Sequence, residues 1–84
     1  MKRKLYVDDE LYLSLEVLAE VYEVRVVWLR EVYDLGLLGR GVDSGTSVCV
    51  AALQLDRLAT IVRLHRVMGL DAETIAMSLT DVLP

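Results

Sequence analysis

Hydrophobic residues recur at helical spacing in the first half of the chain. Between Leu11 and Glu23 the residues Val17, Leu18 and Val21 form an apolar stripe, and Ser14 stands before it as a helix N-cap. A second helix is expected from about residue 26 to 35, with Gly36 at the point where a helix often ends in a left-handed residue. About three residues separate the two segments, which predicts a helix-turn-helix.

The second half of the chain has a different pattern. Residues 36–50 hold four of the five glycines, and short apolar runs flank residues 42–45, which favours a β-hairpin, or wing. Residues 51–68 carry the strongest helical signal, and Gly69 ends it. Asp71 then caps a last helix that is expected to reach about residue 83.

The N-terminal residues 1–10 are mostly charged, so we expect a polar lead in which only residues 5–7 could form a short strand. A length of 84 residues indicates a single domain, 1–84. The fold class predicted from this order is mainly α: two short helices, a small hairpin wing, a long third helix and a short C-terminal helix.

The composition excludes several classes of site. The chain has one cysteine, Cys49, and one histidine, His65, so neither an internal disulfide nor a Cys/His metal cluster is expected. No nucleophile with a neighbouring base is visible. We therefore expect no catalytic residue, no metal, no cofactor and no enzymatic activity, with His65 at a core edge and Cys49 as a small hydrophobe.

The N-terminus lacks the apolar stretch of a signal peptide, and no uninterrupted apolar run is long enough to span a membrane. These two observations predict a cytoplasmic protein that does not enter a membrane. The oligomeric state stays open, and a homo-oligomer is compatible with the sequence.

An ordered set of short motifs carries a family resemblance. Trp28-Leu29-Arg30 opens the second predicted helix and Leu35-Gly36-Leu37-Leu38 ends it, while Arg57-Leu58 lies on the third and Gly69-Leu70-Asp71 precedes the last. Over about residues 12–79 this succession resembles the MerR-like winged helix-turn-helix superfamily. The C-terminal part is similar to the CbpM/DafA-like chaperone modulators.

The resemblance implies a non-enzymatic protein that binds the J-domain of a DnaJ-type co-chaperone and, through it, acts on DnaK. Two departures separate the chain from DNA-binding members of the superfamily. Glu31 and Val32 replace paired aromatic residues, and Val48-Cys49-Val50 replaces an arginine and an aromatic residue in the wing. The alternatives are a MerR-like transcriptional regulator or excisionase-like DNA binder, and an antitoxin-like or oligomerisation module.

Charge distinguishes these functions. The chain has a formal net charge of −4. Residues 14–34, the expected helix-turn-helix, contain two arginines and five acidic residues, a net charge of −3. Because DNA binding rests on many Lys and Arg contacts to phosphate, nucleic acid is an unlikely partner.

The acidic residues of the predicted helix-turn-helix suggest a protein-docking face. The expected contacts are Glu20, Glu23, Trp28, Glu31 and Asp34. Trp28 is expected to point outward as the aromatic anchor, with the carboxylates receiving a basic helix of the partner. The alternative is that Trp28 covers the edge of the core and the carboxylates form an ordinary solvated face.

Overall fold

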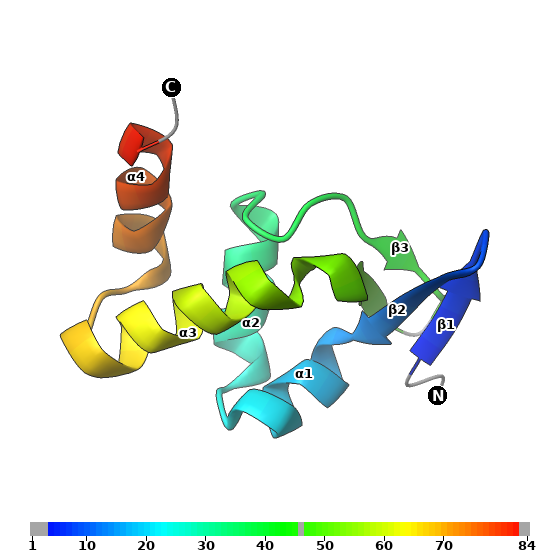
Figure 1. Ribbon diagram of the computed structural model, residues 1–84. Coiled ribbons are helices and arrows are strands. Elements are labelled where there is room, and N and C mark those ends of the chain that lie inside the picture. The colour runs from blue at the N-terminus through cyan, green and yellow to red at the C-terminus, as the bar shows by residue number, and fades with distance from the viewer. Residues whose placement is uncertain (1–3, 46, 83–84) are drawn as a thin grey trace.

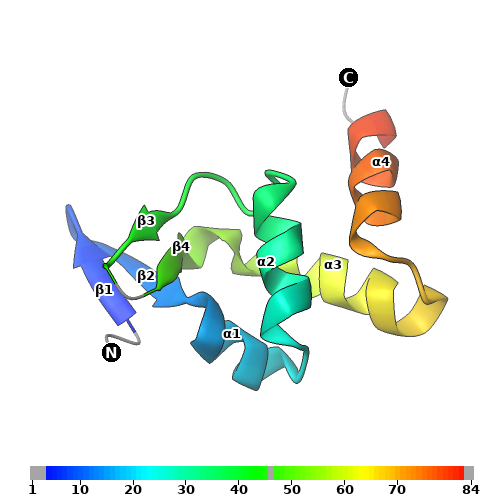
Figure 2. The same cartoon turned by 180° about the vertical axis from the view of Figure 1, so that it is seen from behind.

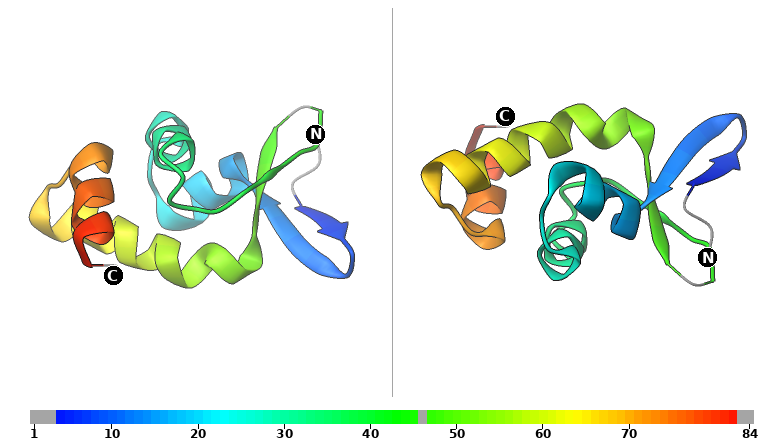
Figure 3. Two further views of the ribbon diagram at one scale, coloured as in Figure 1. Left: turned by 90° about the horizontal axis from the view of Figure 1, so that it is seen from above. Right: turned by 90° about the horizontal axis from the view of Figure 1, so that it is seen from below.

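The computed structural model describes residues 4–45 and 47–82, with side chains to residue 79. Its elements, in chain order, are β1 (Lys4–Val7), β2 (Glu10–Ser14), α1 (Leu15–Tyr22), α2 (Val26–Asp34), β3 (Val42–Asp43), β4 (Val48–Ala51), a 3-10 turn (Ala52–Gln54), α3 (Leu55–Met68) and α4 (Ala72–Val82). The sheet and α4 lie at opposite ends of the molecule, with α1, α2 and α3 between them (Figures 1, 2 and 3).

The four strands form one antiparallel sheet in the order β1-β2-β4-β3. The β1–β2 hairpin pairs Val7 with Glu10, which leaves a loop of two residues, Asp8 and Asp9. Both have positive φ values, 50° and 69°. A two-residue loop with two left-handed residues matches the right-handed twist of the flanking strands, and aspartate tolerates this conformation better than most residues.

The prediction of a mainly α, MerR-like winged helix-turn-helix fold is wrong. In the described residues four helices combine with a four-stranded sheet, and half of that sheet comes from the expected polar lead and from residues 11–14, which precede the first helix. The strand suggested at residues 5–7 is present within β1. The first hairpin escapes prediction because of its turn residues. Asp8 and Asp9 add charge, so the segment resembles a solvated lead, but they form the turn between β1 and β2. The third helix also begins later than predicted, at Leu55, since Ala51 belongs to β4.

The positions of the two short helices agree with the prediction. Ser14 has extended backbone angles and its side-chain oxygen accepts a hydrogen bond from the backbone N–H of Val17 at 3.1 Å, as an N-cap does. α1 ends at Glu23, which adopts a left-handed conformation. Arg66 of α3 donates hydrogen bonds to the carbonyl oxygens of Tyr22 and Glu23, so it satisfies the exposed end of α1 from across the fold.

The core lies where α1, α2, α3 and α4 meet β4. Its fully buried side chains come from these elements and from the segment that follows α2: Leu18, Leu29, Val32, Leu38, Val50, Leu58, Ile61 and Ile75. Cys49 is also completely buried, which confirms its expected place as a small hydrophobic residue. α1 and α2 are therefore fixed against the sheet by one continuous apolar cluster, and their outer faces remain available for function.

Asp71 caps α4 and gives its attachment a pH dependence. Its Oδ1 accepts a hydrogen bond from the backbone N–H of Thr74 at 2.8 Å, and hydrogen bonds from Thr74 hold the pKa of the carboxyl below its ordinary value. A lowered folded pKa stabilises the fold above the unfolded pKa, and this contribution is lost as the pH falls through the folded value.

We predict that Asp71→Asn, which can still cap the helix, loses this acid-range dependence. Urea denaturation of both proteins at neutral and strongly acidic pH measures it. The drop in unfolding free energy on acidification should be smaller for the variant than for the wild type. Glu73→Gln, which removes a carboxylate from the same turn without removing the cap, is the control and should keep the wild-type drop. Equal drops in Asp71→Asn and the wild type would contradict the assignment.

Candidate functional site

The structure spreads the five predicted docking residues over two helices. Glu20 and Glu23 lie at the C-terminal end of α1, while Glu31 and Asp34 lie on the outer face of α2, and all four are exposed. Trp28 does not join them, because its exposed fraction is 8%. The expectation that Trp28 points outward as an anchor is wrong, and the alternative that it covers the core is correct.

Trp28 packs against the only histidine. The rings of Trp28 and His65 stack with centroids 4.4 Å apart and an interplanar angle of 25°. The His65 Nδ1 lies 2.8 Å from the carbonyl oxygen of Leu70, so its N–H can bond the segment that joins α3 to α4. This confirms His65 as a core-edge residue, and it makes the Trp28–His65 pair a link between α2 and the C-terminal helices.

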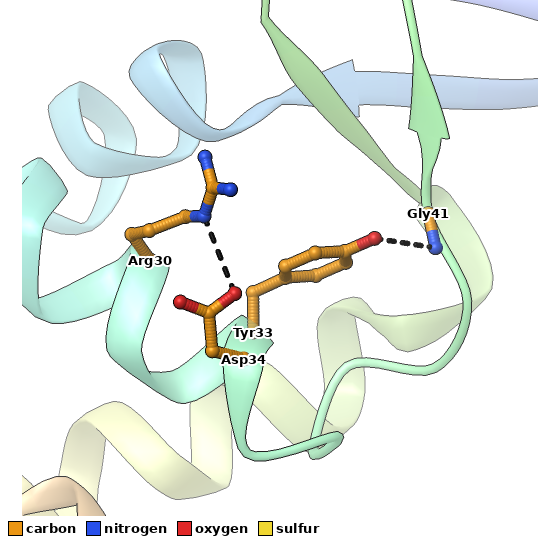
Figure 4. Close-up of polar contacts among 4 residues, drawn as sticks. All are labelled: Arg30, Tyr33, Asp34 and Gly41. Carbon is orange, nitrogen blue, oxygen red and sulfur yellow. Dashed lines mark hydrogen bonds and ion pairs between the residues drawn. The ribbon is translucent and has the colours of Figure 1, made fainter.

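Arginines interrupt the acidic surface. On α2 the Arg30 Nε lies 3.3 Å from the Asp34 Oδ1, and both side chains are more than half exposed (Figure 4). At the end of α1, Arg66 places its guanidinium against the backbone of Glu23. The arginines therefore offset part of the negative charge of this surface, and α1 and α2 do not present a uniformly acidic face.

A pocket that is not predicted from the sequence lies beside the outer face of α2. Its volume is about 320 Å³, at the small end of the range for ligand-binding pockets. It opens between the start of α1, the first turns of α2 and the start of β4. We call it the α1–α2–β4 pocket, and its lining consists of Leu15, Glu16, Val26, Val27, Arg30, Ser47 and Val48.

Two lining residues of the α1–α2–β4 pocket hold polar atoms without partners. The Glu16 Oε1 and the Ser47 Oγ are buried, and neither has a hydrogen-bond partner among the described residues. The backbone of Ser47 is fixed, because its carbonyl oxygen accepts hydrogen bonds from the backbone N–H and the hydroxyl of Ser44 at 2.9 and 3.0 Å. The pocket thus combines aliphatic walls with two unsatisfied polar groups, the usual composition of a binding site.

Other kinds of site find no support in the part of the chain that the structure describes. Among the side chains described, those of residues 4–45 and 47–79, there is no group of three or more His, Cys, Asp or Glu arranged to hold a metal ion. None of the described helices is long and apolar enough to cross a lipid bilayer.

Comparison with known proteins found no matching family model, no similar curated protein and no similar solved structure. The resemblance to chaperone modulators therefore stays a prediction from the sequence.

Proposed function

We propose that the chain is a non-enzymatic protein-binding module, and that the α1–α2–β4 pocket with the adjoining outer face of α2 is its docking surface. The observation that carries the proposal is the pocket, in which unsatisfied groups of Glu16 and Ser47 sit among aliphatic side chains. Buried polar groups are normally paired, so an unpaired set beside an opening favours a site that a ligand completes.

The exposed apolar residues at the pocket support a protein as the ligand. Val27 is 75% exposed and Val26 is 39% exposed, and both line the pocket at the start of α2. Apolar residues at the centre with charged residues around them are typical of protein interfaces. The carboxylates of Glu31 and Asp34 on the same helix disfavour a DNA backbone as the partner.

The partner to test first is the J-domain of a DnaJ-type co-chaperone, through which the chain would modulate or assemble the DnaK–DnaJ system. This choice rests on the sequence resemblance. The pocket and the carboxylates of α1 and α2 are compatible with it, because a basic segment would find both apolar contacts and negative charge there. Transcriptional regulation is the competing proposal, and it requires binding to DNA.

Val27→Arg tests the docking surface. The substitution places a long cationic side chain at the mouth of the pocket, so we expect J-domain affinity to fall by about tenfold or more, the loss of roughly 1.4 kcal/mol or more of binding free energy. Isothermal titration calorimetry of the full chain with the J-domain measures it. Val67→Arg is the matched control, because Val67 is 77% exposed and lies on α3, outside the pocket lining.

Circular dichroism of both variants checks that they fold. Wild-type affinity in Val67→Arg with weakened binding in Val27→Arg would support the surface. Equal affinities of Val27→Arg and Val67→Arg for the J-domain would show that the partner docks on another surface. Absence of J-domain binding by the wild type, with a salt-sensitive shift of DNA in gels, would overturn the proposal in favour of a DNA binder.

A further inference from the structure

The two atoms of the α1–α2–β4 pocket that lack hydrogen-bond partners can both accept hydrogen bonds. Glu16 contributes a carboxylate oxygen, which only accepts hydrogen bonds, and Ser47 contributes a hydroxyl. Ser47 is 9% exposed, so water has little access to that hydroxyl. A buried acceptor without a partner costs free energy, and a carboxylate costs more than a neutral group. A ligand group that brings several donors to one point removes this cost.

The charges around the pocket favour a positive group as that donor. Arg30 also lines the pocket, but its Nε is paired with Asp34 at 3.3 Å, and this ion pair cancels its charge. Glu16 then leaves a net negative charge at the site.

The walls of the pocket define the shape of the ligand. Leu15, Val26, Val27 and Val48 are aliphatic, so the cation must arrive on an apolar stem. Lysine has a four-carbon stem and a compact ammonium with three donors, whereas the guanidinium of arginine is a larger, planar group. Among the side chains of a protein partner, lysine therefore fits both the walls and the acceptors.

We propose that the α1–α2–β4 pocket receives one lysine side chain of the protein partner, whose ammonium donates hydrogen bonds to the Glu16 carboxylate and the Ser47 hydroxyl. This inference rests on the proposed function, since it assumes that a protein docks on this surface. It adds which side chain of the partner the docking surface binds. Apolar contacts at Val26 and Val27 hold the stem, and Glu16 distinguishes lysine from an apolar residue of the same length.

The test uses two probes that differ only in the ammonium: Nα-acetyl-lysine methylamide and Nα-acetyl-norleucine methylamide. Each is titrated into the 15N-labelled full chain and followed by NMR. We expect the lysine probe to shift the amide signals of Glu16, Val26 and Ser47, and the norleucine probe to bind about tenfold more weakly. Glu16→Gln should weaken binding of the lysine probe by about the same factor, while Glu73→Gln on α4, outside the pocket lining, should leave it unchanged.

Several results would overturn the lysine inference. These are equal binding of the two probes, shifts confined to residues outside the pocket, no shifts at all, or wild-type binding by Glu16→Gln. The two proposals fail separately. Suppose that the J-domain binds, that Val27→Arg blocks this binding, and that Glu16→Gln changes the affinity for neither the J-domain nor the lysine probe. The docking surface is then supported and the lysine pocket is not. If the lysine probe binds as expected but no J-domain binding is found, the pocket stands and the named partner does not.

Discussion

Trp28→Ala is expected to destabilise the fold by about 3–5 kcal/mol, the usual cost of truncating a buried aromatic residue to alanine. Trp28 is 8% exposed and loses its stacking contact with His65, 4.4 Å away, when the indole is removed. An 84-residue domain has a small core, and total stabilities of single domains are about 5–15 kcal/mol. A large fraction of the variant should therefore be unfolded under conditions in which the wild type is folded.

Urea denaturation followed by circular dichroism measures this change. Trp28→Phe is the control, because phenylalanine keeps an aromatic ring against His65 and should retain most of the stability. A midpoint of Trp28→Ala equal to that of the wild type would show that the side chain is not part of the core. Because unfolding alone abolishes binding, loss of J-domain affinity in Trp28→Ala is no evidence that Trp28 touches the partner.

The orientation of Trp28 shows one limit of prediction from the sequence. Successive residues of an α-helix differ by about 100° in direction, so the apolar stripe of α2 places Leu29 and Val32 inward but leaves Trp28 at its edge. The acidic neighbours suggested the outward choice. What decides the direction is His65 on α3, which offers a flat surface for stacking, and no feature of the α2 sequence reports it.

The helices were predictable because their signals are local. Ser14 caps α1, Gly36 and Gly69 follow helices, and the apolar stripes lie within single segments. The β1–β2 hairpin also has a local signal, the two-residue Asp8–Asp9 turn between alternating residues. It was missed because each strand is only four or five residues long and the turn residues add to the charge of the segment.

The α1–α2–β4 pocket could not be predicted, because its polar groups come from distant segments. Glu16 stands two residues after Ser14, the last residue of β2, and Ser47 stands two residues before Cys49, which pairs with Ser14 in the sheet. The β2–β4 register therefore brings Ser47 towards the start of α1. Because the sequence predicts no strand at residues 10–14, it does not predict this pairing, and Glu16 counts there only as one of the acidic residues of the expected helix-turn-helix.

Gly41→Ala is expected to destabilise the fold by about 1–3 kcal/mol, the usual range for forcing an extra carbon into a packed site. A Cβ at this position would lie 2.7 Å from the carbonyl oxygen of Cys49 and 2.8–2.9 Å from the ring and hydroxyl of Tyr33. The Cys49 oxygen belongs to β4 and cannot move without disturbing the sheet. The Gly41 N–H also donates a 3.2 Å hydrogen bond to the Tyr33 hydroxyl, which the displaced backbone would lose (Figure 4).

Gly36→Ala separates this steric effect from backbone strain. Gly36 has a φ of +82° and nothing within 4 Å of an added Cβ, so the cost of Gly36→Ala is conformational and about 1–2 kcal/mol.

Denaturation of Gly41→Ala in the Tyr33→Phe background tests the contact itself. Removing the hydroxyl takes away one of the three crowded atoms and should recover part of the lost stability, while the Cys49 carbonyl and the ring carbon of residue 33 still oppose the added Cβ. If Gly41→Ala costs less than Gly36→Ala, and Tyr33→Phe recovers nothing, the connection between α2 and β3 does not pack against Tyr33 as described. Tyr33, Gly41 and Cys49 would then not fix the path of the chain into β3 and β4, the strand from which Val48 reaches the pocket.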